Sequence, residues 1–83
     1  MKTHVLKSLP EYFDPASYGP KNFEIRLNDR DFKVGDRVQI CLWDGKKFVG
    51  QHFNRYITYI TDFQQKPGYV VMATSRWAGG SKE

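Results

Sequence analysis

The sequence predicts a mainly β protein of the α+β class, a small curled sheet or partly closed barrel of five to six strands with one or two short helices near the N-terminus. Segments in which apolar and polar residues alternate recur along the chain, and turn pairs such as Asp44-Gly45 and Pro67-Gly68 separate them. The length of 83 residues suits one compact core, so we expect a single domain over residues 1–83. Periodicity is lost after Thr74, and residues 75–83 are expected to fray.

The first two elements expected are a strand and a short helix. Residues 1–9 mix apolar and polar side chains in the manner of a strand with one partly polar face. A helix then begins near Pro10, because a proline in the first turn costs no helical hydrogen bond. The pair Asp14-Pro15 predicts an interruption, since a proline ring disfavours the helical conformation of the preceding residue, and a separate helical turn is expected up to Tyr18.

The central segment, residues 19–36, organises the rest of the predicted fold. Within it, Phe23, Ile25 and Leu27 alternate with polar residues. This pattern predicts a strand whose apolar face is buried and whose opposite face carries the chemistry. A charged turn over residues 28–31 follows, because short polar side chains suit a tight turn.

Three further strands complete the predicted sheet. Residues 37–43 alternate cleanly, and Asp44-Gly45 is a typical hairpin turn. Residues 48–61 are too long for one regular strand, so we expect a bend or bulge near Gly50. Residues 69–73 form a continuous apolar run, which is typical of a strand covered on both sides.

Composition limits the classes of partner. The net charge of +4 favours an anionic partner. The single cysteine, Cys41, excludes an internal disulfide and is expected in or near the core. Because no apolar run reaches the roughly 18–20 residues of a membrane span and the N-terminus lacks the apolar core of a signal peptide, we expect a cytoplasmic protein with no membrane partner, most simply a monomer.

Lys21, Glu24 and Arg26 form the first candidate site. Glu24 and Arg26 lie two apart on one strand face, and Lys21 lies on the turn that enters the strand, so all three can flank a pocket. An arginine can donate two hydrogen bonds to a phosphate, and a glutamate can accept one from the amine of a nucleobase. The alternative is a solvated row of salt bridges.

The charged turn provides a second set of candidates, Asn28 and Arg30. They can form a rim that orients a ligand, or the turn can hold Arg26 through a buried Asp–Arg pair. The alternative, which the residue types favour, is a polar turn whose side chains satisfy its own backbone. Asp29 and Asp31 lack a third ligand nearby, so we expect no metal ion at this turn. The sequence also has no glycine-rich phosphate loop, so we expect no cofactor.

Three residues outside this segment complete the candidate set. His4 and Lys7 can face the same cleft as Lys21, although a lone histidine on a strand is more often a hydrogen-bonded structural residue. Trp43 precedes the hairpin turn and can stack on a base, or it belongs to the core. Basic residues that can support such surface binding are Lys46, Lys47, Arg55 and Lys66.

The segment Gly19-x-Lys21-x-x-Glu24-x-Arg26, followed by a charged turn and Val34-Gly35-Asp36, resembles ASCH domains (activating-signal-cointegrator homology) of the PUA-like superfamily. Residues 4–13, 56–60 and 68–72 resemble a short bacterial and phage subgroup of these domains, and the match reaches about Thr74. The resemblance implies a PUA-like barrel that binds RNA or a nucleotide-like ligand.

Some small ASCH proteins are amidohydrolases that deacetylate modified cytidine, with a lysine on the turn, a hydroxyl residue three positions on and a glutamate from a later helical insert. Lys21 matches the lysine, whereas Glu24 stands at the hydroxyl position and residues 62–68 are too short for the insert. The sequence therefore favours a binding module over an enzyme. If the protein is an enzyme, Lys21 and Glu24 are the candidate catalytic residues. A third hypothesis, a protein-interaction module of a phage or mobile element, predicts an exposed apolar patch without a basic groove.

Overall fold

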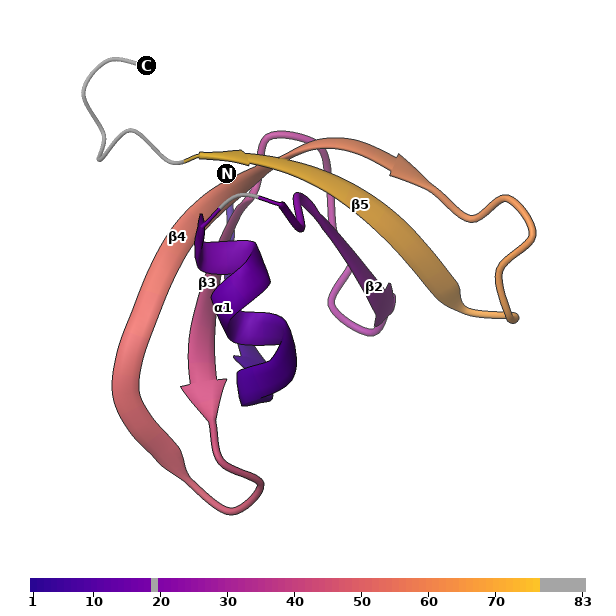
Figure 1. The fold of residues 1–83 in the computed structure, drawn as a ribbon. Coiled ribbons are helices and arrows are strands. Elements are labelled where there is room, and N and C mark those ends of the chain that lie inside the picture. Colours follow the sequence, from indigo (N-terminus) through magenta and orange to yellow (C-terminus); the bar gives the residue numbers. More distant parts are fainter. Residues whose placement is uncertain (19, 77–83) are drawn as a thin grey trace.

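The computed structural model describes residues 1–18 and 20–76. It confirms a mainly β fold with five strands and one short helix (Figure 1). The elements are β1 (Thr3–Ser8), α1 (Pro10–Tyr18), β2 (Phe23–Leu27), β3 (Arg37–Trp43), β4 (Phe48–Thr61) and β5 (Tyr69–Arg76). No helix in the described ranges is long and apolar enough to cross a membrane.

All five strands belong to one sheet, in the order β1-β3-β4-β5-β2. β1 runs parallel to β3, and the other neighbouring pairs are antiparallel. The sheet curls into a half-barrel, and α1 lies on its concave side (Figure 1). Two guanidinium groups reach β1 from the other edge of the sheet: Arg26 of β2 donates to the Lys7 carbonyl at 2.9 Å, and Arg30 of the loop after β2 donates to the Val5 carbonyl.

Two irregularities interrupt the pairing of β4 and allow the sheet to curl. Between β3 and β4 the register shifts after Cys41, which pairs with His52, to Trp43, which pairs with Phe48. Gly50 lies within this shift and has a φ of +94°, a conformation that residues with a side chain rarely adopt. The predicted bulge near Gly50 is therefore confirmed. A second shift occurs between β4 and β5 at Ile57.

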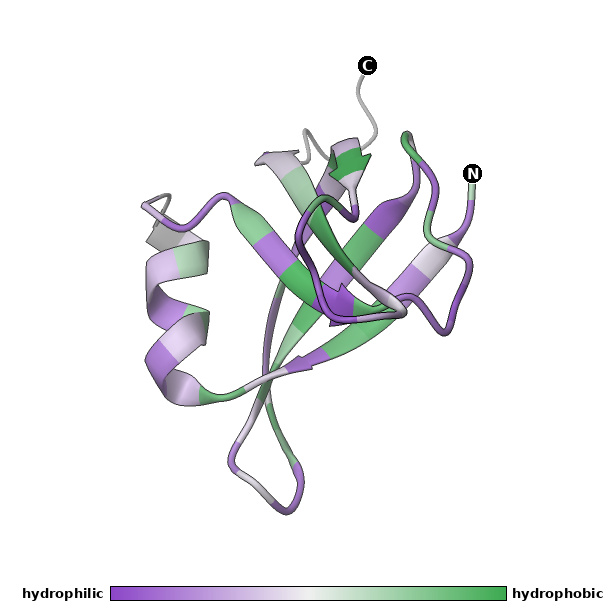
Figure 2. Ribbon diagram, turned by 90° about the vertical axis from the view of Figure 1, so that its right-hand side faces the viewer, coloured by the Kyte–Doolittle hydropathy of each residue, from purple (hydrophilic) through white to green (hydrophobic). Residues whose placement is uncertain are grey.

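The core lies on the concave face of the sheet. Hydrophobic and hydrophilic residues alternate along the strands (Figure 2). In β3 the inward residues include Val38 and Ile40, as the sequence predicts. The buried apolar residues are Leu6, Phe13, Phe32, Val38, Ile40, Ile57, Val70 and Met72.

Two sequence predictions about β5 are wrong. The strand is covered on one side only, because Val70 and Met72 are buried whereas Tyr69 is 37% exposed. It also reaches Arg76, which pairs with Arg55 of β4, so residues 75 and 76 are part of the sheet. Backbone pairing with β4 holds this end of the strand in place. The remainder of the predicted frayed tail, residues 77–83, lies outside the described residues.

The predicted orientation of β2 is also wrong. Phe23, Ile25 and Leu27 are 41%, 52% and 47% exposed, whereas Glu24 is only 4% exposed. The cause is the register with β5, in which Glu24 pairs with the inward-facing Met72. Because side chains alternate with a period of two, this register turns the polar residues of β2 inward and its apolar residues outward.

The predicted interruption of the helix does not occur, because α1 runs from Pro10 to Tyr18 with Pro15 inside it. Pro15 has no N–H, so the helix loses one hydrogen bond at that position. Phe13 and Ala16, on either side of the proline, are 5% and 1% exposed. Burial of these two residues on one helix face holds the turns together despite the missing bond.

The reversed orientation of β2 can be tested with two matched isoleucine truncations. Ile40→Ala should lower the free energy of unfolding by about 2–5 kcal/mol, because it leaves a cavity in the core. In dilute, monomeric protein, Ile25→Ala should lower it by no more than about 1 kcal/mol, since that side chain is 52% exposed in the single chain. Urea unfolding followed by circular dichroism measures both values. Equal losses would show that Ile25 is a core residue after all.

Candidate functional site

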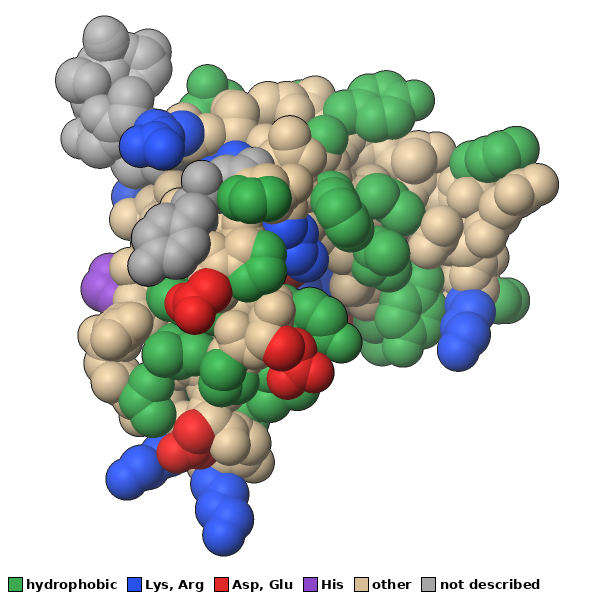
Figure 3. Space-filling model, in the orientation of Figure 1, with side chains coloured by type: hydrophobic (Ala, Val, Ile, Leu, Met, Phe, Trp, Pro, Cys, Tyr) green, Lys and Arg blue, Asp and Glu red, His purple; other side chains and the backbone are tan. Residues whose placement is uncertain are grey.

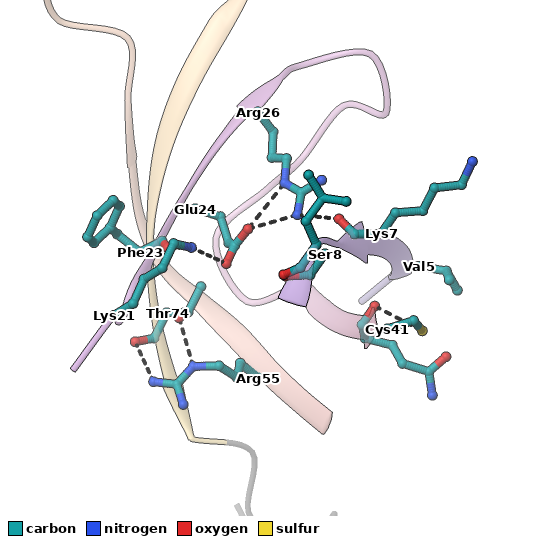
Figure 4. A network of polar contacts seen from close by, with 12 residues as sticks. Val5, Lys7, Ser8, Lys21, Phe23, Glu24, Arg26, Cys41, Arg55 and Thr74 are labelled. Atoms are coloured by element: carbon teal, nitrogen blue, oxygen red, sulfur yellow. Dashed lines mark hydrogen bonds and ion pairs between the residues drawn. The ribbon is translucent and has the colours of Figure 1, made fainter. Parts of the chain in front are cut away.

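Lys21, Glu24 and Arg26 converge on one another, with the Glu24 carboxylate at the centre (Figure 4). The Lys21 ammonium donates to Glu24 Oε2 at 2.7 Å. Arg26 donates to Glu24 Oε1 through Nη2 at 2.9 Å and through Nε at 3.2 Å. The side chains of Lys21 and Arg26 are 19% and 26% exposed, so both cations remain accessible to solvent.

Three elements position this cluster. Glu24 and Arg26 point inward from β2, two residues apart. The backbone N–H of Lys21 donates to the Pro15 carbonyl at 3.1 Å, which ties the turn before β2 to α1. Arg26 also reaches the Lys7 carbonyl of β1, so the cluster connects both edge strands and the helix.

Arg55 adds a third cation from β4. It is 8% exposed and donates from Nε to Thr74 Oγ1 at 2.9 Å. Burial lowers the pKa of Arg55 from its ordinary value and nearby Arg76 lowers it further, while the Glu24 carboxylate opposes both effects. Glu24 is thus paired with Lys21 and Arg26, and Arg55 lies near enough to feel its charge, so these four groups carry excess positive charge. The sequence alone places Arg55 in a surface patch, because no local signal reports its proximity to β2.

An open pocket of about 570 Å³ lies beside the cluster, between α1 and the edge strands. Its lining combines the polar cluster with exposed apolar side chains from α1 and β2. The lining residues are Lys7, Ser8, Leu9, Tyr12, Lys21, Phe23, Glu24, Ile25 and Arg26. Sequence reasoning missed Ser8, Leu9 and Tyr12, because only the curl of the sheet brings them opposite β2.

The other candidates lie outside the pocket lining, except Lys7. The Lys7 ammonium lies 4.0 Å from the centroid of the Trp43 ring, and Trp43 also packs edge-on against Phe48. Asn28 accepts a hydrogen bond from the backbone of Phe32 at 2.9 Å, which matches the alternative of a self-satisfied polar turn. Trp43 and Asn28 are therefore held by contacts elsewhere.

No Asp–Arg pair from the charged turn, one of the two possibilities for that turn, holds Arg26 among the described residues, and Arg26 pairs with Glu24 instead. Arg30 lies near Asp29, with a closest N–O distance of 3.7 Å, and bridges to the edge of β1. Asp31 pairs with Lys33 at 3.2 Å on the surface. Among the described residues, no group of three or more histidine, cysteine or acidic side chains is arranged to hold a metal ion.

His4 is buried and directed at Asp36 rather than at the pocket. Its Nε2 lies 2.8 Å from Asp36 Oδ2, and its ring packs edge-on against Phe32. The backbone N–H groups of Lys2 and Lys33 also donate to the Asp36 carboxylate. The His4–Asp36 pair thus joins the start of β1 to the turn before β3, which is a structural role.

These features define a small curled-sheet protein with an open, positively charged pocket at its edge strands. The chain belongs to the family described as Domain of unknown function (DUF3850), which matches residues 3–74. It is also similar to the "Uncharacterized 12.9 kDa protein in GpA 3'region" of Escherichia phage P2, with 34% identity over 61 residues. That match covers 74% of this chain and 56% of the phage protein, so the chain spans little more than half the length of that relative.

The His4–Asp36 pair predicts a pH-dependent contribution to stability. Burial raises the pKa of Asp36, but hydrogen bonds from His4, Lys2 and Lys33 outweigh burial and lower the pKa from 3.8. A carboxyl group with a lowered folded pKa stabilises the protein above its unfolded pKa, near pH 4, and this contribution is lost as the pH falls through the folded pKa. Asp36→Asn should therefore cost about 1–3 kcal/mol at neutral pH, and the cost should shrink below pH 4.

Urea unfolding of wild type and Asp36→Asn across this pH range measures the difference. Asp62→Asn is the matched control, because Asp62 is exposed in the loop between β4 and β5. A difference for Asp36→Asn that stays constant with pH would contradict the role of its charge.

Proposed function

We propose that this chain is a PUA-like binding module that recognises RNA or a nucleotide-like ligand in the pocket beside Lys21, Glu24 and Arg26. The observation that carries the proposal is a buried carboxylate that holds cations at an open pocket of about 570 Å³ with apolar walls. The resemblance of residues 19–36 to ASCH domains supports the same class of ligand.

The hydrogen-bond inventory indicates how the ligand is recognised. The ammonium of Lys21 has three donors and uses two, on the Phe23 carbonyl and on Glu24. Arg26 uses Nε and Nη2 on described residues, which leaves Nη1 for a ligand. Both oxygens of Glu24 already accept hydrogen bonds. Recognition therefore falls on the cations, and the ligand is one that offers acceptors such as phosphate or carbonyl oxygens.

The pocket walls favour a ligand with a flat apolar part as well. Tyr12 of α1 lines the pocket and is 51% exposed, so its ring is open to a ligand. Stacking of a base on an exposed aromatic ring contributes roughly 1–3 kcal/mol. A nucleotide joins such a ring to a phosphate, which matches both features of the pocket. Lys7 of β1 also lines the pocket, but its ammonium lies over the Trp43 ring, so Lys21 and Arg26 are the cations that face a ligand.

Binding can be tested by titrating labelled single-stranded RNA and fluorescent mononucleotides, with the corresponding nucleosides as ligands that lack phosphate. Lys21→Ala and Arg26→Ala should each weaken binding by about 10–100-fold, the effect of one hydrogen bond between charged groups. The nucleosides should bind more weakly than the nucleotides. Fluorescence anisotropy measures these affinities, and circular dichroism checks that each variant is folded.

Lys46→Ala is the matched control, because it removes the same charge from the exposed turn between β3 and β4. It should change the affinity little. The proposal fails if no ligand binds at low salt, or if Lys46→Ala weakens binding as much as Lys21→Ala does.

An amidohydrolase is the second candidate function. It is favoured by the contact of 2.7 Å between Lys21 and Glu24, and by the hydroxyl residue Ser8, which lines the same pocket. A lysine–carboxylate pair can transfer protons, and a hydroxyl can act as a nucleophile. Release of cytidine from acetylated cytidine, abolished by Lys21→Ala, would favour the enzyme. Unchanged acetylated cytidine after long incubation would favour the binding module.

A further inference from the structure

The apolar side chains of β2 point outward and create an apolar surface on the convex side of the sheet. In cross-strand register, Phe23 of β2 pairs with Ala73 of β5, which pairs with Tyr59 of β4. Neighbouring rows extend this surface toward the other end of β2. We call it the outer apolar face, and it consists of Phe23, Ile25, Leu27, Tyr59, Tyr69, Val71 and Ala73, together with the polar Thr61, which pairs with Val71. Because β2 is an edge strand, Phe23 and Ile25 also border the pocket.

The convex surface is continuously apolar where β2 and β5 pair, and of mixed character over β1 and β3. In Figure 3 hydrophobic side chains gather where β2 and β5 lie, and others surround α1. In the mixed part, the register of β1 and β3 places Thr3 beside Arg37 and Val5 beside Gln39. The contrast shows that the outer apolar face is a distinct patch rather than the ordinary scatter of exposed apolar residues.

The area of this face can be compared with the area that a dimer buries. Its five largest side chains are between 37% and 62% exposed. With roughly 200 Å² for each whole side chain, they leave about 400–500 Å² of mainly apolar surface in solvent. A stable interface of standard size buries about 800 Å² on each partner, of which roughly 60% is apolar. The outer apolar face therefore has about the apolar area that one side of such an interface requires.

We propose that the outer apolar face packs against the same face of a second copy of this chain and forms a two-fold symmetric dimer. A two-fold interface needs a patch that is complementary to itself. A face without charged residues and with three aromatic rings meets this condition, because no like charges are brought together. Val71 lies at the centre of the face, since β5 runs between β2 and β4. The dimer axis therefore passes near Val71.

Light scattering on a sizing column and sedimentation equilibrium test the dimer. Wild type at micromolar concentration should have twice the chain mass of 9.7 kDa and should dissociate on dilution. Leu27→Lys and Val71→Lys should shift the protein to the monomer, because each would place charges in an apolar interface. Val34→Lys is the matched control and should leave the dimer intact, since Val34 is 61% exposed in the loop between β2 and β3.

Cross-linking keeps the proposal testable even if a lysine variant fails to fold. In a Cys41→Ser background, Val71→Cys should be joined to a second copy by a short bis-maleimide, and Val34→Cys should not. The proposal is overturned if wild type is a monomer at every concentration. It is also overturned if folded Leu27→Lys and Val71→Lys remain dimeric, or if Val34→Cys cross-links as fast as Val71→Cys.

Discussion

Burial of the Glu24 carboxylate is the constraint around which this small fold is arranged. A charged group removed from water is costly unless it is paired and hydrogen-bonded. Glu24 meets this requirement with three hydrogen bonds from Lys21 and Arg26, and Arg55 adds positive charge from β4. Because Arg26 also donates to the backbone of β1 and Lys21 to the backbone of β2, the group around this carboxylate connects both edge strands.

The same constraint explains both surfaces for which we propose a role. With Glu24 and Arg26 turned inward, the cationic cluster lies beside a pocket at the edge strands. The apolar residues of β2 are turned outward at the same time, because neighbouring side chains on a strand point to opposite faces. The pocket and the outer apolar face are thus two consequences of one strand register.

Local signals predicted much of the fold and part of the site. The strand β3, the turn at Asp44-Gly45 and the bulge at Gly50 follow from alternation and from residues that favour turns, which act over short distances. The convergence of Lys21, Glu24 and Arg26 follows from spacing within one strand and the turn before it.

What the sequence could not predict depends on contacts between distant segments. The orientation of β2 is set by its pairing with β5, almost fifty residues further on, which alternation within β2 cannot report. The pairing of His4 with Asp36 depends on the alignment of β1 beside β3. The proximity of Arg55 to Glu24 depends on the alignment of β4 and β2 on either side of β5. Helix α1 continues through Pro15 because Phe13 and Ala16 on either side of it are buried against the core. Helix propensity does not include this packing.

A double-mutant cycle on Glu24 and Arg26 tests this constraint most directly. Urea unfolding of Glu24→Ala, Arg26→Ala and the double variant gives the coupling free energy of the pair, and the exposed pair Asp31 and Lys33 serves as the control cycle. The buried pair should show a coupling of about 1–3 kcal/mol, and the control pair less than about 0.5 kcal/mol. A Glu24–Arg26 coupling no larger than that of the control would contradict the view that pairing with Arg26 compensates the burial of this carboxylate.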